Sequence, residues 1–146
     1  MLLTYYSSTL RQKDLNFLLE GQWLNDQIMN FYYEYLSKIY LNNNEKRNQS
    51  IILLDPAVAN TFQYCRDELE GLNEFFGKLN LSNANQLIFL PMNDNTNPHL
   101  VSGGTHWSLL ILQNQTQYYY LDSVTGSNII NQPYYQLNVL DTAKKL

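Results

Sequence analysis

Two residues of this sequence, His106 and Asp122, carry the side chains of a general base and of the acid that would orient it. Each borders a predicted strand, 107–112 or 118–121, and the polar segment 113–117 between the strands has the length of a β-hairpin connection. With an odd-numbered connection the two residues share one face, directly opposite or as diagonal neighbours roughly 7 to 8 Å apart by backbone. An imidazole and a carboxylate in contact there would form the orienting half of a nucleophile–base–acid triad.

A purely structural interpretation of the same pair stays open at this point. His106 could be a hydrogen-bonded strand residue, and Asp122 could be a polar residue that ends a strand. An even-numbered connection would also place the two side chains on opposite faces of the hairpin. Spacing alone therefore does not establish a catalytic pair.

A thiol nucleophile would have to come from a cysteine, and the sequence holds one, Cys65. The pattern around it predicts the middle of a helix, on an apolar stripe with Phe62 and Leu69. The glycine-bearing turn and helix N-terminus that expose and acidify a reactive thiol are missing there. We therefore expect a buried structural role for Cys65, although its position upstream of the histidine does not by itself forbid catalysis.

A long amphipathic helix is predicted over residues 24–40, before the catalytic candidates. Asn25 is placed to cap its start, Asp26 falls in the first turn, and Trp23 lies just outside. The prediction rests on apolar and aromatic residues that recur three and four positions apart: Ile28, Phe31, Tyr32, Tyr35, Leu36 and Ile39.

The remaining predicted elements are two helices and four short strands. Asp55 and Pro56 have the residue types of a helix start, and the helix would carry Val58 and Phe62 on its apolar face. The segment 123–146 contains no convincing element. The other predicted elements are a buried strand over 51–54, a helix over 69–79, and strands over 87–92, 107–112 and 118–121.

Size and composition limit the class of protein. The 146 residues suit one domain, 1–146, and the 45% hydrophobic share is ordinary for a globular chain. A net charge of −4 argues against nucleic-acid binding, which needs basic patches. The sequence shows no signal peptide and no apolar run of the ~20 residues that span a bilayer, so we expect no membrane association and a cytoplasmic or nuclear location. We expect no cofactor, and no metal site because no ligand cluster has zinc spacing.

Five sequence blocks together resemble the ubiquitin-like-protein proteases of the sentrin-specific type, and within them most closely the deneddylase that processes the Nedd-type modifier. The resemblance covers about residues 1–128. The most specific blocks are Trp-Leu-Asn-Asp at 23–26 and Gly-Gly-Thr-His-Trp-Ser at 103–108. The others are Leu-Arg-Gln with an Asp at 10–14, Asn-Asp-Asn at 93–95 and Asp-Ser at 122–123.

The resemblance implies an α+β, papain-like cysteine protease fold with the triad in the chain order His, Asp, Cys. His106 matches the general base and Asp122 the residue that orients it. The family's cysteine and the glutamine that donates to the oxyanion follow the aspartate, and we expect them beyond residue 146. The resemblance thus implies a fold that is incomplete at the C-terminus of this chain.

The resemblance also implies substrate-binding residues. Trp23 and Trp107 match the tryptophans that close over the modifier's Gly-Gly tail, although either could be an ordinary core or surface aromatic. Asp26 matches a position near the same cleft. The segment 93–102 resembles a mobile loop that folds over the tail, although a plain connection is as good an interpretation. Asn93, Gly103 and Gly104 belong to that region and complete the predicted substrate-binding set.

Two functions follow from these expectations. The first is a thiol protease that cleaves after the C-terminal Gly-Gly of a ubiquitin-like modifier, of Nedd type by preference, to mature it or to release it from conjugates. The second is a catalytically inactive module that binds such a modifier. A chain lacking the family's C-terminal helices should also expose an apolar face, through which it could associate with a partner.

Overall fold

The computed structural model describes residues 2–41, 50–64, 85–95, 97, 99–100, 103–113 and 117–123. Helices and two sheets make up these residues, which confirms the predicted α+β class. The predicted helix over 69–79, Cys65 and most of the segment 123–146 lie outside the described residues.

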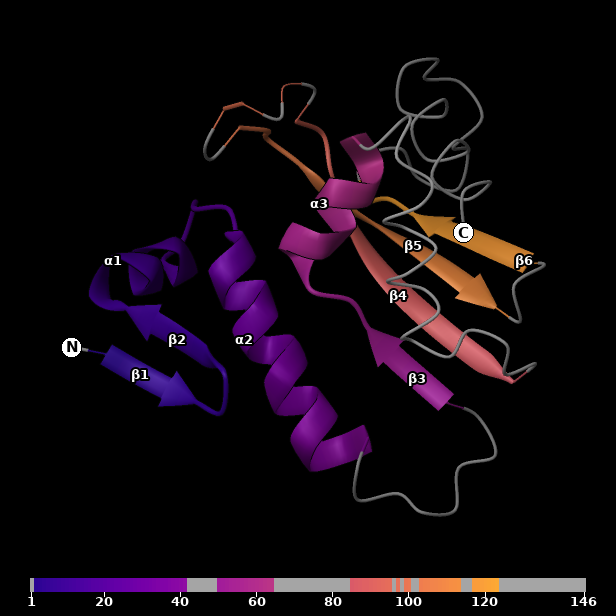
Figure 1. The fold of residues 1–146 in the computed structure, drawn as a ribbon. Helices are drawn as coiled ribbons and strands as arrows, with labels where there is room; N and C mark the ends of the chain where they lie inside the picture. Colours follow the sequence, from indigo (N-terminus) through magenta and orange to yellow (C-terminus); the bar gives the residue numbers. More distant parts are fainter. Residues whose placement is uncertain are drawn as a thin grey trace.

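The chain begins with a small hairpin that the sequence did not predict. β1 (Leu2–Tyr5) pairs antiparallel with β2 (Ser8–Arg11), and the short helices α1 (Gln12–Leu15) and η1 (Asn16–Leu18) follow. Figure 1 shows α2 lying between this hairpin and the rest of the molecule. The hairpin therefore packs against the side of α2 that faces away from the main sheet.

The predicted helix over 24–40 forms over a shorter range. α2 spans Asp26–Leu36 and continues into a π-helical turn, η2 (Ser37–Leu41). Asn25 caps α2 as predicted, because its side chain accepts a hydrogen bond from the Ile28 amide at 2.9 Å. Leu24 stays outside the helix.

The main sheet has four strands in the order β3-β4-β5-β6. β3 (Ser50–Leu53) runs parallel to β4 (Gln86–Asn93), whereas β5 (Trp107–Gln113) is antiparallel to both β4 and β6 (Gln117–Leu121). The strands lie side by side in Figure 1, with β3 and β6 at the two edges. All four predicted strands are confirmed.

One helix covers a face of this sheet. α3 (Pro56–Tyr64) starts as predicted, with the Asp55 carboxylate accepting from the Ala57 amide at 2.7 Å. The core forms where α3 packs on alternate residues of β4 and β5. Its buried members are Leu54, Ala59, Phe62, Ile88, Leu90, Met92, Leu110 and Leu112.

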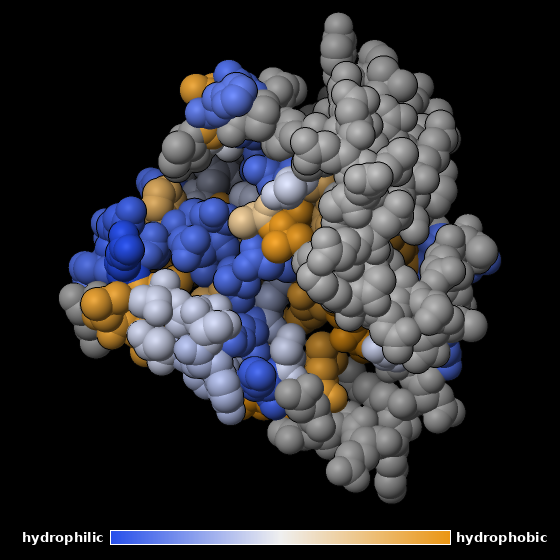
Figure 2. Space-filling model, viewed as in Figure 1, coloured by the Kyte–Doolittle hydropathy of each residue, from blue (hydrophilic) through white to orange (hydrophobic). Residues whose placement is uncertain are grey.

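In the view of Figure 2, the hydrophobic residues, coloured orange, lie mainly over α3 and the strands, with a smaller patch at β1. The side chains of Leu2 and Leu3 in β1 are 67% and 48% exposed. At the other edge of the molecule, Tyr119 and Leu121 of β6 are 49% and 54% exposed. Association of the chain through an apolar face stays a prediction.

Candidate active site

The hairpin of β5 and β6 brings His106 and Asp122 together. Leu109 pairs with Leu121 and Gln113 with Gln117, so the connection is odd-numbered and the two candidates fall on one face as diagonal neighbours. The Nε2 atom of His106 lies 2.7 Å from the Oδ1 atom of Asp122. Their side chains are 14% and 7% exposed, so little water competes for this contact.

The contact determines which imidazole nitrogen carries the proton. An ionised carboxylate only accepts hydrogen bonds, so Nε2 of His106 must donate to Asp122. In a neutral imidazole the other nitrogen, Nδ1, then has the free lone pair. The pair can therefore take up a proton at Nδ1, and the carboxylate would stabilise the imidazolium that results.

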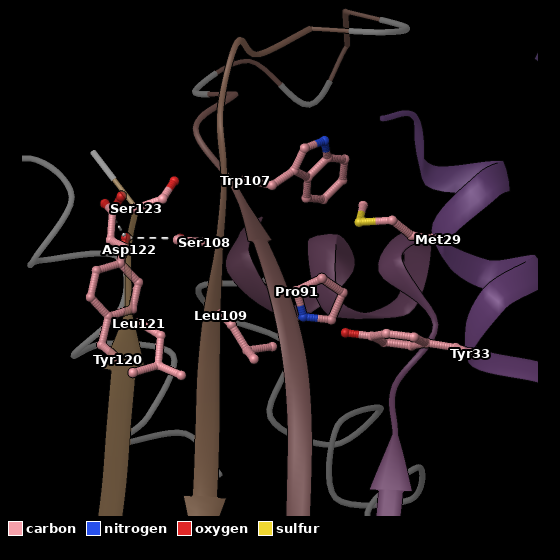
Figure 3. A pocket seen from close by; sticks show the side chains of 10 residues that line it. All are labelled: Met29, Tyr33, Pro91, Trp107, Ser108, Leu109, Tyr120, Leu121, Asp122 and Ser123. Carbon is pink, nitrogen blue, oxygen red and sulfur yellow. Dashed lines mark hydrogen bonds between the residues drawn. The ribbon is translucent and has the colours of Figure 1, made fainter. Parts of the chain in front are cut away.

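The Tyr120 hydroxyl also lies beside the Asp122 carboxylate, which was not predicted from the sequence. The Tyr120 hydroxyl donates to Oγ of Ser108 at 2.8 Å and lies 3.4 Å from Oδ2 of Asp122. Figure 3 shows Tyr120, Ser108 and Asp122 grouped at the ends of β5 and β6. Burial raises the pKa of Tyr120, and the Asp122 charge adds to this effect. Tyr120 is thus a protonated donor beside Asp122, and its position two residues before the aspartate on the same face was the available signal.

The other face of the sheet holds Trp107, which the structure ties to the segment around Trp23. Its indole Nε1 donates to the Leu24 carbonyl at 2.9 Å, although the residues are 83 positions apart. Trp23, the residue directly before Leu24, is 66% exposed. The side chain of Trp107 is thus hydrogen-bonded to the backbone of the residue that follows Trp23.

Trp107 also lines a cavity of about 620 Å³ between α2 and the sheet. In Figure 3, Met29 and Tyr33 extend from α2 toward this space, opposite Trp107 and Pro91. The cavity reaches Asp122, so Trp107 and the carboxylate of the candidate pair border the same space. Its lining consists of Met29, Tyr33, Pro91, Trp107, Ser108, Leu109, Tyr120, Leu121, Asp122 and Ser123.

The start of α2 is held by a buried carboxylate. Asp14, only 4% exposed, accepts from the Arg11 amide at 2.8 Å and from Nδ2 of Asn25 at 3.2 Å. Asn25 in turn caps α2. Asp26 is exposed and accepts from the Gln27 amide at 2.9 Å, so it lies at the surface three residues after Trp23.

The structure places Asn93, Gly103 and Gly104 in one tightly packed turn. A Cβ atom at Gly104, where φ is +89°, would lie 2.0 Å from Oδ1 of Asn93, and one at Gly103 would lie 2.5 Å from Nδ2 of Asn95. Both asparagines are buried. Only glycine fits so close to these side chains, so the two glycines have a structural reason to be there. Their contact with a substrate stays a prediction.

Neither a metal site nor a membrane segment emerges from the described residues. Within those ranges, His, Cys, Asp and Glu side chains do not gather in a group of three that could hold a metal ion. No helix there is long and apolar enough to cross a membrane. The second histidine, His99, is exposed and does not join the candidate pair.

Known proteins match this chain over most of its length. It is 35% identical to a probable sentrin-specific protease 8 of Dictyostelium discoideum, over 88% of this chain and 53% of the relative. Identity to NEDD8-specific protease 1 of Arabidopsis thaliana is also 35%, over 87% and 53%. Sentrin-specific protease 8 of Homo sapiens is 33% identical over 90% and 59%. The chain therefore spans little more than half the length of these relatives.

A protein-family model matches residues 22–140 and describes the C-terminal catalytic domain of the Ulp1 protease family. The matched range includes both tryptophans and the His106–Asp122 pair. Because this match covers well over half of the sequence, the chain belongs to the Ulp1 protease family.

Proposed function

We propose that this protein is a cysteine-type peptidase that cleaves after the C-terminal Gly-Gly of a ubiquitin-like modifier, with a Nedd-type modifier as the preferred substrate. The hydrogen bond between His106 and Asp122 carries this proposal, because it prepares an imidazole to accept a proton. The names of the relatives, sentrin-specific and NEDD8-specific proteases, support the choice of substrate.

In the proposed reaction, Nδ1 of His106 takes the proton of a cysteine thiol that we place in sequence after residue 146. The thiolate attacks the carbonyl carbon of the last glycine, and Asp122 stabilises the imidazolium. The imidazolium then protonates the leaving amine as the peptide or isopeptide bond breaks. Water, deprotonated by His106, finally hydrolyses the thioester and frees the modifier.

Substrate selection would depend on the two tryptophans. Trp107 is held against the Leu24 backbone, next to the exposed Trp23, and it borders the same cavity as Asp122. A chain that passes between two indoles toward Asp122 has little room for side chains. A diglycine tail fits this restriction, and the extended glycine backbone would supply hydrogen bonds there.

Binding of a Nedd-type modifier with and without its last two glycines tests this part of the proposal by calorimetry. We expect binding that needs the glycines and that weakens about thirtyfold in Trp107→Ala, as for a central aromatic of an interface. Tyr32→Ala, an aromatic on α2 that is 54% exposed, is the matched control and should bind as the wild type does. Equal binding of the shortened modifier would contradict the proposal.

A second candidate function is a module that binds the modifier without cleaving it. It is favoured by the single cysteine of the sequence, Cys65, whose surroundings predict a structural role. Capture by a modifier with a C-terminal electrophile separates the two functions, since a binding module would hold the modifier reversibly and a protease covalently.

A further inference from the structure

Asp94 makes an unusually dense set of hydrogen bonds to the two residues that lead into β5. Its Oδ1 atom accepts from the amides of Thr105 and, at 3.0 Å, of His106, and its Oδ2 atom accepts from the Thr105 hydroxyl at 2.7 Å. Its own amide donates to the His106 carbonyl at 3.1 Å. Asp94 therefore binds both backbone polar groups of the candidate base.

We propose that Asp94 is a positioning residue for His106, holding its backbone so that the imidazole reaches Asp122. The base would then be fixed by two carboxylates, one on its backbone and one on its ring. The role in catalysis rests on the proposed function, whereas the effect on the geometry of His106 does not.

The position of His106 in the sheet explains why such a clamp is needed. The ladder between β4 and β5 ends at the pair Asn93 and Trp107, so His106 is the first residue outside regular strand pairing. The chain approaches it from the segment that includes Gly103 and Gly104 and would otherwise be free to rotate about several backbone bonds. A small rotation at His106 would lengthen its 2.7 Å contact with Asp122, since that bond depends on where the Cα atom lies.

The surroundings of Asp94 fit this role. At Gly104 the chain passes so close that a Cβ atom would lie 2.6 Å from Oδ1 of Asp94. Burial would raise the pKa of Asp94, but the hydrogen bonds from Thr105 and His106 outweigh it and hold the pKa below the ordinary value. The carboxylate thus stays ionised and accepts strong, charge-assisted hydrogen bonds at neutral pH.

The alternative is that Asp94 only closes the loop between β4 and β5 and contributes to stability. Imidazole NMR distinguishes the two roles, because an Asp94 that only stabilised the loop would leave the His106 ring signals unchanged in a folded variant. The chain has two histidines, and the exposed His99 provides an internal reference. In the ¹⁵N-labelled chain, produced without a histidine tag, we expect His106 to be the tautomer protonated at Nε2, with a proton protected from solvent exchange.

In Asp94→Ala we expect the His106 Nε2 proton to exchange at least about tenfold faster, approaching the behaviour of His99, while contacts between β4 and β5 persist. Asp55→Ala is the matched control, since it removes a similar carboxylate-to-amide bond, at the start of α3. That control should lower stability and leave the His106 signals unchanged.

Unchanged His106 exchange and tautomer in a folded Asp94→Ala chain would overturn the proposal. If that variant does not fold, Thr105→Val and Asp94→Asn remove only part of the clamp, and each must speed exchange at His106 for the proposal to stand. Loss of diglycine-dependent binding in the wild type would instead contradict the proposed function, and it would not alter these imidazole signals.

Discussion

The hydrogen bond between Asp14 and Asn25 predicts a measurable energetic coupling between these two residues, which join the N-terminal hairpin to the start of α2. Asp14 is buried and accepts from the Arg11 amide and from Asn25, which caps α2 directly after Leu24. The Leu24 carbonyl in turn holds the Trp107 indole. Replacing Asp14 and Asn25 by alanine, singly and together, tests whether these bonds act as one unit.

Each substitution should lower the free energy of unfolding by an amount that follows from the bonds it removes. Asp14→Ala removes two hydrogen bonds to a buried charge and leaves two donors unpaired, which should cost about 3 kcal/mol in the free energy of unfolding. Asn25→Ala removes the cap, about 1 kcal/mol, and also the Asp14 contact, about 1 kcal/mol more. The double variant should lose about 4 kcal/mol, which is about 1 kcal/mol less than the sum, because the shared bond is removed once.

Urea unfolding, followed by the fluorescence of the two tryptophans, measures these free energies. Asp26→Ala is the control, since Asp26 is an exposed carboxylate bonded only to the neighbouring Gln27 amide among the described residues, and it should cost about 0.5 kcal/mol. Losses that add within about 0.3 kcal/mol in the double variant would refute the coupling between Asp14 and Asn25.

Three further predictions concern stability. Burial would raise the pKa of Glu34, but hydrogen bonds from the turn of the N-terminal hairpin, among them those of the Ser7 amide and hydroxyl, lower it from 4.5 to about 2. The stability that Glu34 contributes is therefore complete above about pH 4.5 and lost as the pH falls toward 2. In Glu34→Gln the urea midpoint should depend less on pH over this range, and the same pH dependence as in the wild type would contradict this. Tyr120→Phe should cost about 1 kcal/mol in urea unfolding by removing the hydroxyl between Ser108 and Asp122, and no loss would mean that this bond does not contribute. Leu110→Ala, at a fully buried position of the core, should cost about 3 kcal/mol in the same assay. A cost below about 1 kcal/mol would contradict this and would mean that neighbouring side chains fill the space left by Leu110.

Local signals in the sequence predicted much of the fold. The polar connection between two apolar strands determined the face on which His106 and Asp122 meet, because side chains alternate along a strand. Asn25 and Pro56 predicted the starts of two helices through the backbone groups that a helix leaves unpaired. These features depend on a few neighbouring residues and can be read without knowledge of the tertiary structure.

The N-terminal hairpin had no such local signal. β1 is only four residues long and its side chains are mostly exposed, so no alternating pattern marks it. Its turn contains no glycine, and Tyr6 adopts a positive φ of 49°. The turn is held instead by α2, through two hydrogen bonds from Ser7 to the Glu34 carboxylate, at 3.0 and 2.8 Å. A turn stabilised by a residue 27 positions away cannot be predicted from its own sequence.

Long-range contacts also changed the site. The predicted helix over 24–40 begins two residues later, because Asn25 is its N-cap, and the Leu24 carbonyl before the cap accepts from Trp107. Asp94 was part of a recognised block, but its bonds to Thr105 and His106 span a loop and have no periodicity. Residue types thus identified the candidate base and its candidate acid, while the groups that hold them required the three-dimensional structure.

In the proposed function, His106 and Asp122 serve the thiol of a modifier-specific protease. The most direct measurement is covalent capture of the protein translated from the complete transcript by a Nedd-type modifier with a C-terminal electrophile. We predict capture at a cysteine after residue 146, slowed about 10²-fold or more in His106→Ala. Capture that is undiminished in His106→Ala, capture that is abolished by Cys65→Ser, or no capture at all would contradict the claim.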